Sequence, residues 1–107
     1  MKEVNYLNLL EHTASTLIRE GVVENYREFS RKFCRKTENF YYRQTHFNRD
    51  FSTDALINCL KNIRRANKHY NKWSVVFQSE KDALTELDEL LTRELQRRLG
   101  LKIEFEL

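Results

Sequence analysis

Apolar side chains recur every three or four residues through most of the chain, the spacing that places them on one face of an α-helix. The first stretch with this spacing predicts a helix over residues 4–20. Gly21 follows it directly, in the position where a glycine commonly ends a helix. The apolar stripe of this helix comprises Leu7, Leu10, Ala14, Leu17 and Ile18.

Two shorter helices are predicted next, over 26–35 and 38–47. Asn25 precedes the first of them and Glu28 stands three residues later, which is the arrangement of a capping box. Thr37 is expected to cap the second, with Glu38 in a first turn whose dipole favours an anion. The aromatic side chains expected to face the core from these helices are Phe29, Phe33, Phe40 and Phe47.

Two longer helices follow in the second half of the chain. Ser52 is expected to cap the fourth helix, which frays within 64–70. Ser79, with Asp82 three residues later, is expected to open the fifth helix, which Gly100 ends. The expected buried face of the fourth helix comprises Ala55, Leu56, Cys59, Leu60 and Ile63. The fifth helix carries a leucine ridge made of Leu84, Leu87, Leu91 and Leu95.

Two segments suit strands. Residues 101–107 alternate between apolar and polar side chains, as a half-buried strand does, and residues 73–78 fit either a strand or a helical turn. However, the chain has no proline and two glycines, too few for the tight turns of a strand-rich fold. The sequence therefore predicts a mainly α, five-helix fold. A helical domain spans 1–72, and 73–107 form a packing or dimerisation unit in which the two segments can form a short β-strand pair.

Size and composition narrow the class of protein. At 107 residues and 13.0 kDa the chain is near the usual size of one domain. No apolar run reaches the roughly 18–20 residues that a membrane helix needs, and the N-terminus lacks the apolar segment of a secretory signal. Two cysteines without such a signal do not make a disulfide framework. We therefore expect a cytoplasmic protein with no membrane partner.

The charge is concentrated in the middle of the chain. Residues 25–73 carry twelve Lys/Arg and four Asp/Glu, whereas 1–24 and 74–107 are both net acidic. A field of this kind attracts polyanions and speeds their encounter, most simply nucleic acid. The alternative is that these side chains form solvated helix faces without a ligand.

The middle segment has the order of residues that a helix-turn-helix unit needs. Ser30 supplies a small side chain between Phe29 and Phe33, where a second helix can cross, and Phe40 supplies the inward apolar side chain of that second helix. Residues 26–47 resemble the helix-turn-helix DNA-binding domain of small bacterial and phage regulators. Cys34 stands at the turn position where glycine is usual, and a left-handed backbone there would be strained.

The resemblance implies that 38–47 enters the major groove of duplex DNA. Asn39 would then pair with adenine and Arg43 with guanine, and one of the adjacent Tyr41 and Tyr42 is expected to be exposed. Lys36 and Thr37 at the helix N-terminus, and the arginines around it, would contact phosphates, and Arg64, Arg65 and Lys68 could extend that contact. The predicted DNA-binding residues are Arg31, Arg35, Lys36, Thr37, Asn39, Tyr41, Tyr42, Arg43 and Arg49.

No catalytic or metal site is indicated. The chain has no glycine-rich phosphate loop. Its histidines and cysteines stand at spacings that match no metal site. Cys59 fits a core position instead. We therefore expect no catalytic residue, no metal and no cofactor. The residues considered were His12, His46, His69, Cys34 and Cys59.

The leading hypothesis is a small non-enzymatic DNA-binding protein, a transcriptional regulator of phage or mobile-element type whose partner is double-stranded DNA. Two leucine ridges packed across a dyad would give a homodimer through the C-terminal helix, as palindromic sites require. The alternative is a small protein-interaction module, such as a phage-type inhibitor of the anti-defence or anti-CRISPR kind. In that case the basic face would bind a protein or nucleoprotein partner.

Overall fold

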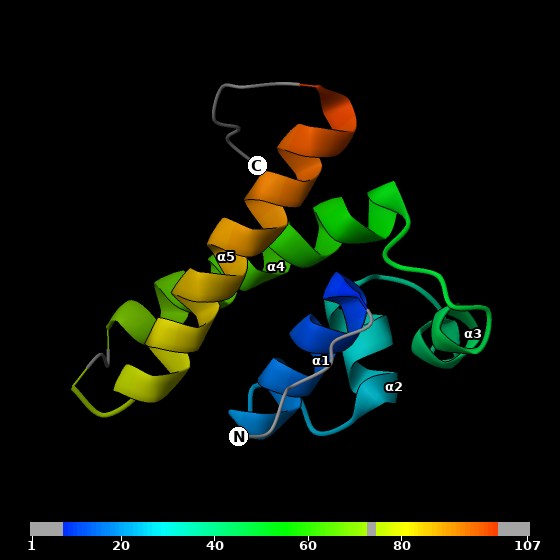
Figure 1. Cartoon of the computed structure of the whole chain (residues 1–107). Coiled ribbons are helices and arrows are strands. Elements are labelled where there is room, and N and C mark those ends of the chain that lie inside the picture. Colours follow the sequence, from blue (N-terminus) through cyan, green and yellow to red (C-terminus); the bar gives the residue numbers. More distant parts are fainter. Residues whose placement is uncertain (1–7, 73–74, 101–107) are drawn as a thin grey trace, which may run out of the picture.

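The computed structural model describes residues 8–72 and 75–100, and within them the chain is α-helical without a strand (Figure 1). The mainly α, five-helix prediction is confirmed. Of the two predicted strand segments, 101–107 and 73–74 lie outside the described residues, and 75–76 form a turn. The elements are α1 (Leu9–Arg19), α2 (Tyr26–Glu28), the π-helical segment η1 (Phe29–Phe33), α3 (Phe40–His46), α4 (Thr53–Asn71) and α5 (Gln78–Leu99).

The two longest helices, α4 and α5, form an antiparallel hairpin against which the shorter elements pack (Figure 1). The α1 helix packs on α5, and η1 packs on α4. The α3 helix packs on α2 and η1 and lies at the outer edge of the molecule. Among the described helices, none is both long and apolar enough to cross a membrane.

One hydrophobic core runs through all of these elements. The buried face of α4 is the predicted one. The leucine ridge of α5 is also buried within the chain, so that residues 78–99 serve as a packing element. Each leucine buried in this way stabilises the fold by roughly 1.5–3 kcal/mol. The core contains Leu10, Ala14, Leu17, Phe29, Phe33, Phe40, Leu56, Leu60, Ile63, Leu84, Leu87, Leu91 and Leu95.

Side-chain caps set the starts of the first two helices. The Oδ1 atom of Asn8 accepts a hydrogen bond from the backbone N–H of Glu11 at 2.9 Å and caps α1, which begins at Leu9. Residues 4–7 of the predicted helix lie outside the described residues. Asn25 accepts from the N–H of Glu28 at 2.9 Å and caps α2 as predicted. In return, Oε1 of Glu28 accepts from the N–H of Glu24 at 2.8 Å.

The ends of α1 and α5 agree with the sequence, but the end of α4 and the start of α5 do not. Gly21 and Gly100 adopt positive φ angles of 75° and 70° directly after their helices. The α4 helix continues to Asn71 without fraying in 64–70, and Tyr70 in its last turn packs on Phe77 with ring centroids 5.2 Å apart.

Phe77, not Ser79, precedes α5. The predicted capping role of Ser79 is wrong because its hydroxyl donates a hydrogen bond to Oε1 of Glu20, 2.6 Å away at the end of α1. The Asp82 carboxylate accepts from the side-chain amide of Gln78 instead of a backbone group of the cap. A contact between distant parts of the chain thus replaces the local cap.

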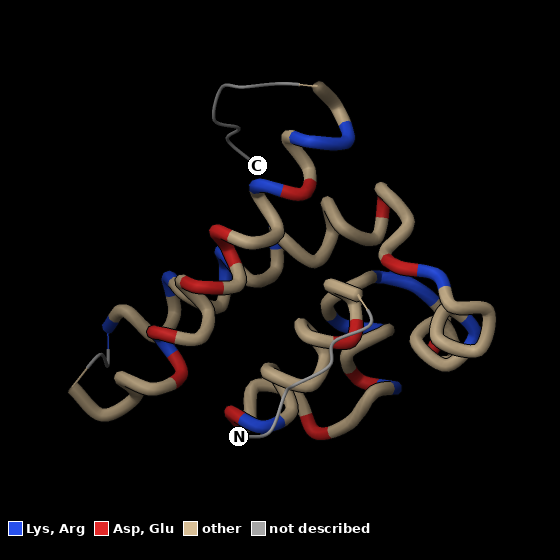
Figure 2. The backbone as a smooth tube through the Cα atoms, viewed as in Figure 1, with Lys and Arg blue, Asp and Glu red and all other residues tan. Residues whose placement is uncertain are grey.

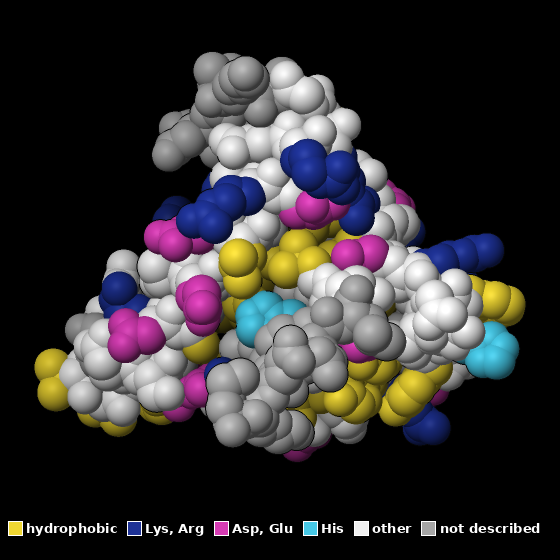
Figure 3. Space-filling model, viewed as in Figure 1, with side chains coloured by type: hydrophobic (Ala, Val, Ile, Leu, Met, Phe, Trp, Pro, Cys, Tyr) yellow, Lys and Arg dark blue, Asp and Glu magenta, His cyan; other side chains and the backbone are white. Residues whose placement is uncertain are grey.

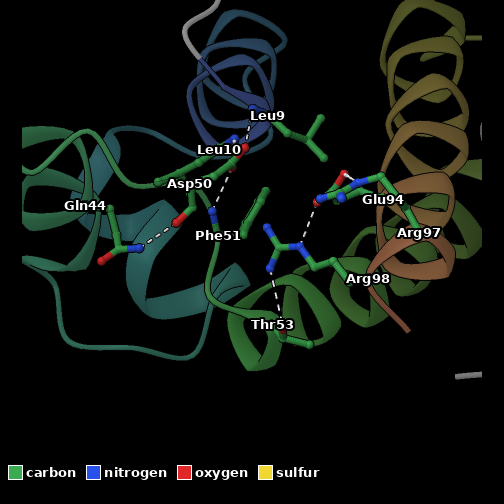
Figure 4. Close-up of polar contacts among 9 residues, drawn as sticks. All are labelled: Leu9, Leu10, Gln44, Asp50, Phe51, Thr53, Glu94, Arg97 and Arg98. Carbon is green, nitrogen blue, oxygen red and sulfur yellow. Dashed lines mark hydrogen bonds and ion pairs between the residues drawn. The ribbon is translucent and has the colours of Figure 1, made fainter. Parts of the chain in front are cut away.

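Asp50 joins the loop before α4 to the start of α1 (Figure 4). Its carboxylate accepts hydrogen bonds from the backbone N–H groups of Leu9 at 3.1 Å, Leu10 at 2.9 Å and Phe51 at 2.7 Å. The side-chain amide of Gln44 in α3 donates to the Asp50 carbonyl at 2.6 Å. Three segments therefore meet at this one residue.

Glu94 lies at the same end of the hairpin, in the last part of α5 (Figure 4). Its Oε2 atom accepts from Arg97 at 2.6 Å and from Arg98 at 2.7 Å, and Arg98 also donates to the hydroxyl of Thr53 at 3.2 Å. These hydrogen bonds, that from Arg97 first, lower the pKa of Glu94 to about 2. The end of α5 is thereby tied to the start of α4.

Candidate nucleic-acid interface

The α3 helix is attached to the preceding helical segment through the Ser30 hydroxyl group. Ser30 has no exposed surface. Its Oγ atom donates to the carbonyl of Tyr26 at 2.9 Å and accepts from the backbone N–H of Tyr41 at 3.0 Å. A residue with a larger side chain would separate the two segments here, so the small position identified in the sequence lies where α3 meets η1.

The two adjacent tyrosines of α3 divide between the core and the surface. The Tyr41 side chain is 8% exposed and stacks on Tyr26 with ring centroids 4.1 Å apart, and burial raises its pKa. Tyr42 is 46% exposed. The expectation that one of the pair faces outward is confirmed. Tyr41 is a core residue, however, and cannot contact DNA as it is placed.

The connection between η1 and α3 is longer than expected, because α3 begins at Phe40 and Asn39 precedes it. Thr37 is therefore not an N-cap; its carbonyl accepts from the N–H of Phe40 at 3.0 Å in a turn. The left-handed residue of this connection is Arg35, at a φ of 58°, whereas Cys34 has an ordinary φ of −84°. The left-handed backbone expected at Cys34 is therefore found at the next residue, Arg35.

Two amides of α4 hold the end of η1 in place. The side-chain amide of Asn58 donates to the carbonyl of Cys34 at 3.0 Å, and that of Asn62 donates to the carbonyl of Phe33 at 3.1 Å. Sequence reasoning missed both residues. Their spacing of four positions beside the buried face of a helix was the available signal, because it places two amides on one side of that helix.

Four of the predicted phosphate and base contacts are exposed arginines. Arg31, Arg35, Arg43 and Arg49 all reach solvent, and none forms an ion pair within residues 8–72 and 75–100. Lys36 differs, because its ammonium group pairs with Asp54 and lowers the pKa of that carboxyl to about 2. Lys36 is also outside the N-terminal turn of α3, so that its expected place at a helix N-terminus is wrong, as is that of Thr37.

The outer side of α3 is a shallow hollow of about 370 Å³ lined by Asn39, Tyr42, Arg43, His46 and Phe47. Phe47 was expected in the core but is 59% exposed, because α3 ends at His46 and the chain turns away through Asn48, which has a φ of 54°. The guanidinium carbon of Arg49 lies 5.1 Å from the centre of the Phe47 ring. This surface combines cationic, amide and aromatic groups.

Comparison with known proteins gives a family but no activity. Residues 10–104 match a family of unknown function, DUF6626. The chain belongs to this family. No curated protein and no solved structure shows a significant match to this DUF6626 chain.

The cysteines of this DUF6626 protein lie in the core. Cys34 and Cys59 are both free thiols without exposed surface, as expected for Cys59. Burial, together with a hydrogen bond to the Cys34 thiol, raises the pKa of Cys59. In the part of the chain that the structure describes, His, Cys, Asp and Glu side chains form no group of three that could hold a metal ion.

Proposed function

We propose that the chain is a non-enzymatic protein that binds double-stranded DNA through the outer side of α3. The observation that carries this proposal is the placement of α3. It rests on α2 and η1 through Ser30, while Asn39 and Arg43 on its other side are exposed. A seven-residue helix is about 10 Å long, which suits a major groove about 12 Å wide.

Asn39 and Arg43 supply the base contacts in this proposal. They stand four residues apart, so their Cα atoms are separated by about 6 Å along the helix axis, close to two base-pair steps. Asparagine can bind adenine and arginine can bind guanine through two hydrogen bonds each. Arg31, Arg35 and Arg49 would contact phosphates, which position the protein without reading sequence.

The regulatory role proposed from the sequence requires a defined site, and a homodimer would read a palindromic one. The leucine ridge of α5 is buried in its own chain, so the prediction of a homodimer formed through that ridge is wrong. We propose a homodimer formed through another surface as the form that binds DNA. Sedimentation equilibrium of the free protein tests it, and a monomer mass at micromolar concentration would refute it.

The test of DNA binding is a selection from a pool of random duplexes, followed by titration of the selected duplex at several salt concentrations. Arg43→Ala and Asn39→Ala are expected to relax base preference by roughly 1–3 kcal/mol each. Arg35→Ala should weaken binding to all sequences alike. Arg93→Ala, which removes an exposed arginine of α5, is the matched control. The absence of salt-sensitive binding to any duplex would refute the proposal.

The exposed Phe47 favours a second candidate, the protein-interaction module. An apolar ring of this exposure is typical of a protein-contact surface, and Tyr42 lies on the same side of α3. In this case Phe47→Ala would abolish binding to a protein partner, and Arg35→Ala would change mainly its association rate. Salt-dependent binding to duplex DNA that survives Phe47→Ala would decide for the first candidate.

A further inference from the structure

Four cations form a row along the solvent side of α4 and its C-cap, which we call the cationic stripe: Lys61, Arg65, Lys68 and Lys72. All four side chains are exposed. Among the described residues none of them forms an ion pair, and Arg65 donates one hydrogen bond to the neighbouring Asn62. Figure 2 shows Lys and Arg recurring along α4 from its middle to its C-terminal end.

Arg64, at the edge of the cationic stripe next to α5, is held differently by the fold. Arg64 faces α5, where it donates to Asp88 at 3.1 Å and to Thr92 at 3.0 Å. Its expected role in extending a DNA contact stays a prediction. The face shown in Figure 3, where α5 and α1 lie in front of α4, mixes Lys/Arg with Asp/Glu. Arg64 is thus paired with Asp88, whereas the four cations of the stripe have no acidic partner among the described residues.

The spacing of the cationic stripe works against the stability of α4. Like charges three or four residues apart on a helix repel one another, and a helix face that serves only for solvation usually alternates in sign. Successive cations of the stripe are four, three and four residues apart, so each lies next to another cation on the helix surface. The repulsion is relieved when a polyanion lies along the row.

The dimensions of the stripe fit a nucleic-acid strand. From residue 61 to residue 72 the helix axis rises about 17 Å, which equals the length of about five base-pair steps measured along the duplex axis. A hollow of about 430 Å³ lies among Lys61, Arg64, Arg65 and Lys68. We propose that the cationic stripe binds the phosphate backbone of duplex DNA. The inference rests on the proposed function, and it adds a second contact surface to that of α3.

The two surfaces are connected through the end of η1. Asn58 holds the carbonyl of Cys34, and Lys36 pairs with Asp54 in the first turn of α4. Arg35 is exposed and lies between Cys34 and Lys36 in the sequence. It is therefore beside the first half of α4, about one turn before Lys61. The cations of the connection and those of α4 can thus follow the same backbone.

The experiment compares Lys68→Glu with the parent chain on a fluorescein-labelled, mixed-sequence duplex of about 30 base pairs. The new carboxylate stands four residues before Lys72 and three after Arg65, in positions where opposite charges stabilise a helix. These pairs offset the cost of an anion in the last turn of α4, so we expect a melting temperature close to that of the parent. Affinity should fall at least about eightfold at 0.1 M salt, and the log–log salt slope should decrease by about 1.

Arg93→Glu, the same charge reversal at an exposed position of α5, is the matched control. It should leave affinity within about twofold of the parent. Equal losses for the two variants would show an effect of net charge alone and would overturn the inference. So would unchanged binding by Lys68→Glu.

Two further results separate this inference from the proposed function. If Arg43→Ala weakens binding and Lys68→Glu does not, the α3 proposal stands and the cationic stripe has no role. If the parent binds vesicles of anionic phospholipid but no duplex, both proposals fall.

Discussion

The hydroxyl group of Ser30 makes two hydrogen bonds at a point without exposed surface, one to each of the helical segments that it joins. A buried backbone N–H that loses its only partner costs about 1–3 kcal/mol, more than the bond itself contributes. At the scale of single residues, this hydroxyl is therefore what holds α3 against η1.

Ser30→Ala removes the acceptor of the Tyr41 N–H. We expect the free energy of unfolding to fall by about 1–3 kcal/mol, measured by urea denaturation. Ser15→Ala, a half-buried position of α1, is the control and should stay within about 0.5 kcal/mol of the parent. Equal stability of the Ser30→Ala variant and the parent would show that water or a small shift of α3 satisfies the Tyr41 N–H.

Arg35 combines an exposed cation with a left-handed backbone, so its two roles can be separated. Glycine adopts a φ of 58° without the strain that a Cβ causes. Arg35→Gly should therefore be more stable than Arg35→Ala by about 1 kcal/mol in urea denaturation. Both variants lack the same charge, so both should weaken DNA binding to the same extent. A difference in binding between them would instead indicate that the backbone conformation itself positions the contact.

At the scale of elements, positions within one helix could be predicted and contacts between helices could not. The buried face of α4 follows from periodicity alone, and Asn25, Gly21 and Gly100 act locally. Ser79 carries the local pattern of a cap, but its hydroxyl bonds to Glu20 from a distant turn. No sequence pattern within a few residues of Ser79 predicts that its hydroxyl bonds to Glu20.

The candidate site also combines features that the sequence predicts with features that depend on contacts between helices. The small Ser30 at the crossing and the exposure of one tyrosine could be predicted from the residue order. Periodicity placed Phe47 in the core because it assumed that the helix continues, whereas α3 ends at His46. The connection that holds Thr37 outside α3 depends on Asn58 and Asn62 of α4, which lie more than 20 positions away.

Asp50 lies in the loop before α4 and accepts hydrogen bonds from the first turn of α1, so its removal tests how α1 is held. Asp50→Ala abolishes three acceptor contacts, two of them at the first turn of α1. We expect a loss of about 2 kcal/mol in the free energy of unfolding, measured by urea denaturation. Asp82→Ala, whose carboxylate accepts from the exposed Gln78 side chain, should cost less than about 0.5 kcal/mol. Similar losses in the two variants would contradict the capping role.

At the scale of the whole molecule, the Glu94 carboxylate binds Arg98, the residue that joins the end of α5 to the start of α4, and it gives stability a defined pH dependence. The folded-state pKa of Glu94 is about 2, below its ordinary value of 4.5. The carboxylate therefore adds stability that is fully present above about pH 4.5 and is lost as the pH falls toward 2.

Glu94→Gln should lower the free energy of unfolding at neutral pH by less than about 1 kcal/mol, as is typical of ion pairs near the surface. It should also flatten the decline of stability between pH 4.5 and 2. Urea titrations at neutral and acidic pH measure both effects. Glu89→Gln, at an exposed position of the same helix, should follow the parent curve. A variant curve parallel to that of the parent would exclude Glu94 as the source.

The π turn of η1, in which the Cys34 N–H bonds to the carbonyl of Phe29, accommodates one more residue than an α turn would. Deleting a single residue there would restore an ordinary α turn and rotate α1 and α2 by about 100° relative to α3, α4 and α5. The N-terminal third of the molecule would then no longer present its aromatic side chains to the hairpin. The length of this short segment is therefore constrained together with its buried residues, and natural variants should exchange the exposed Arg31 and Lys32 more readily than they gain or lose a residue.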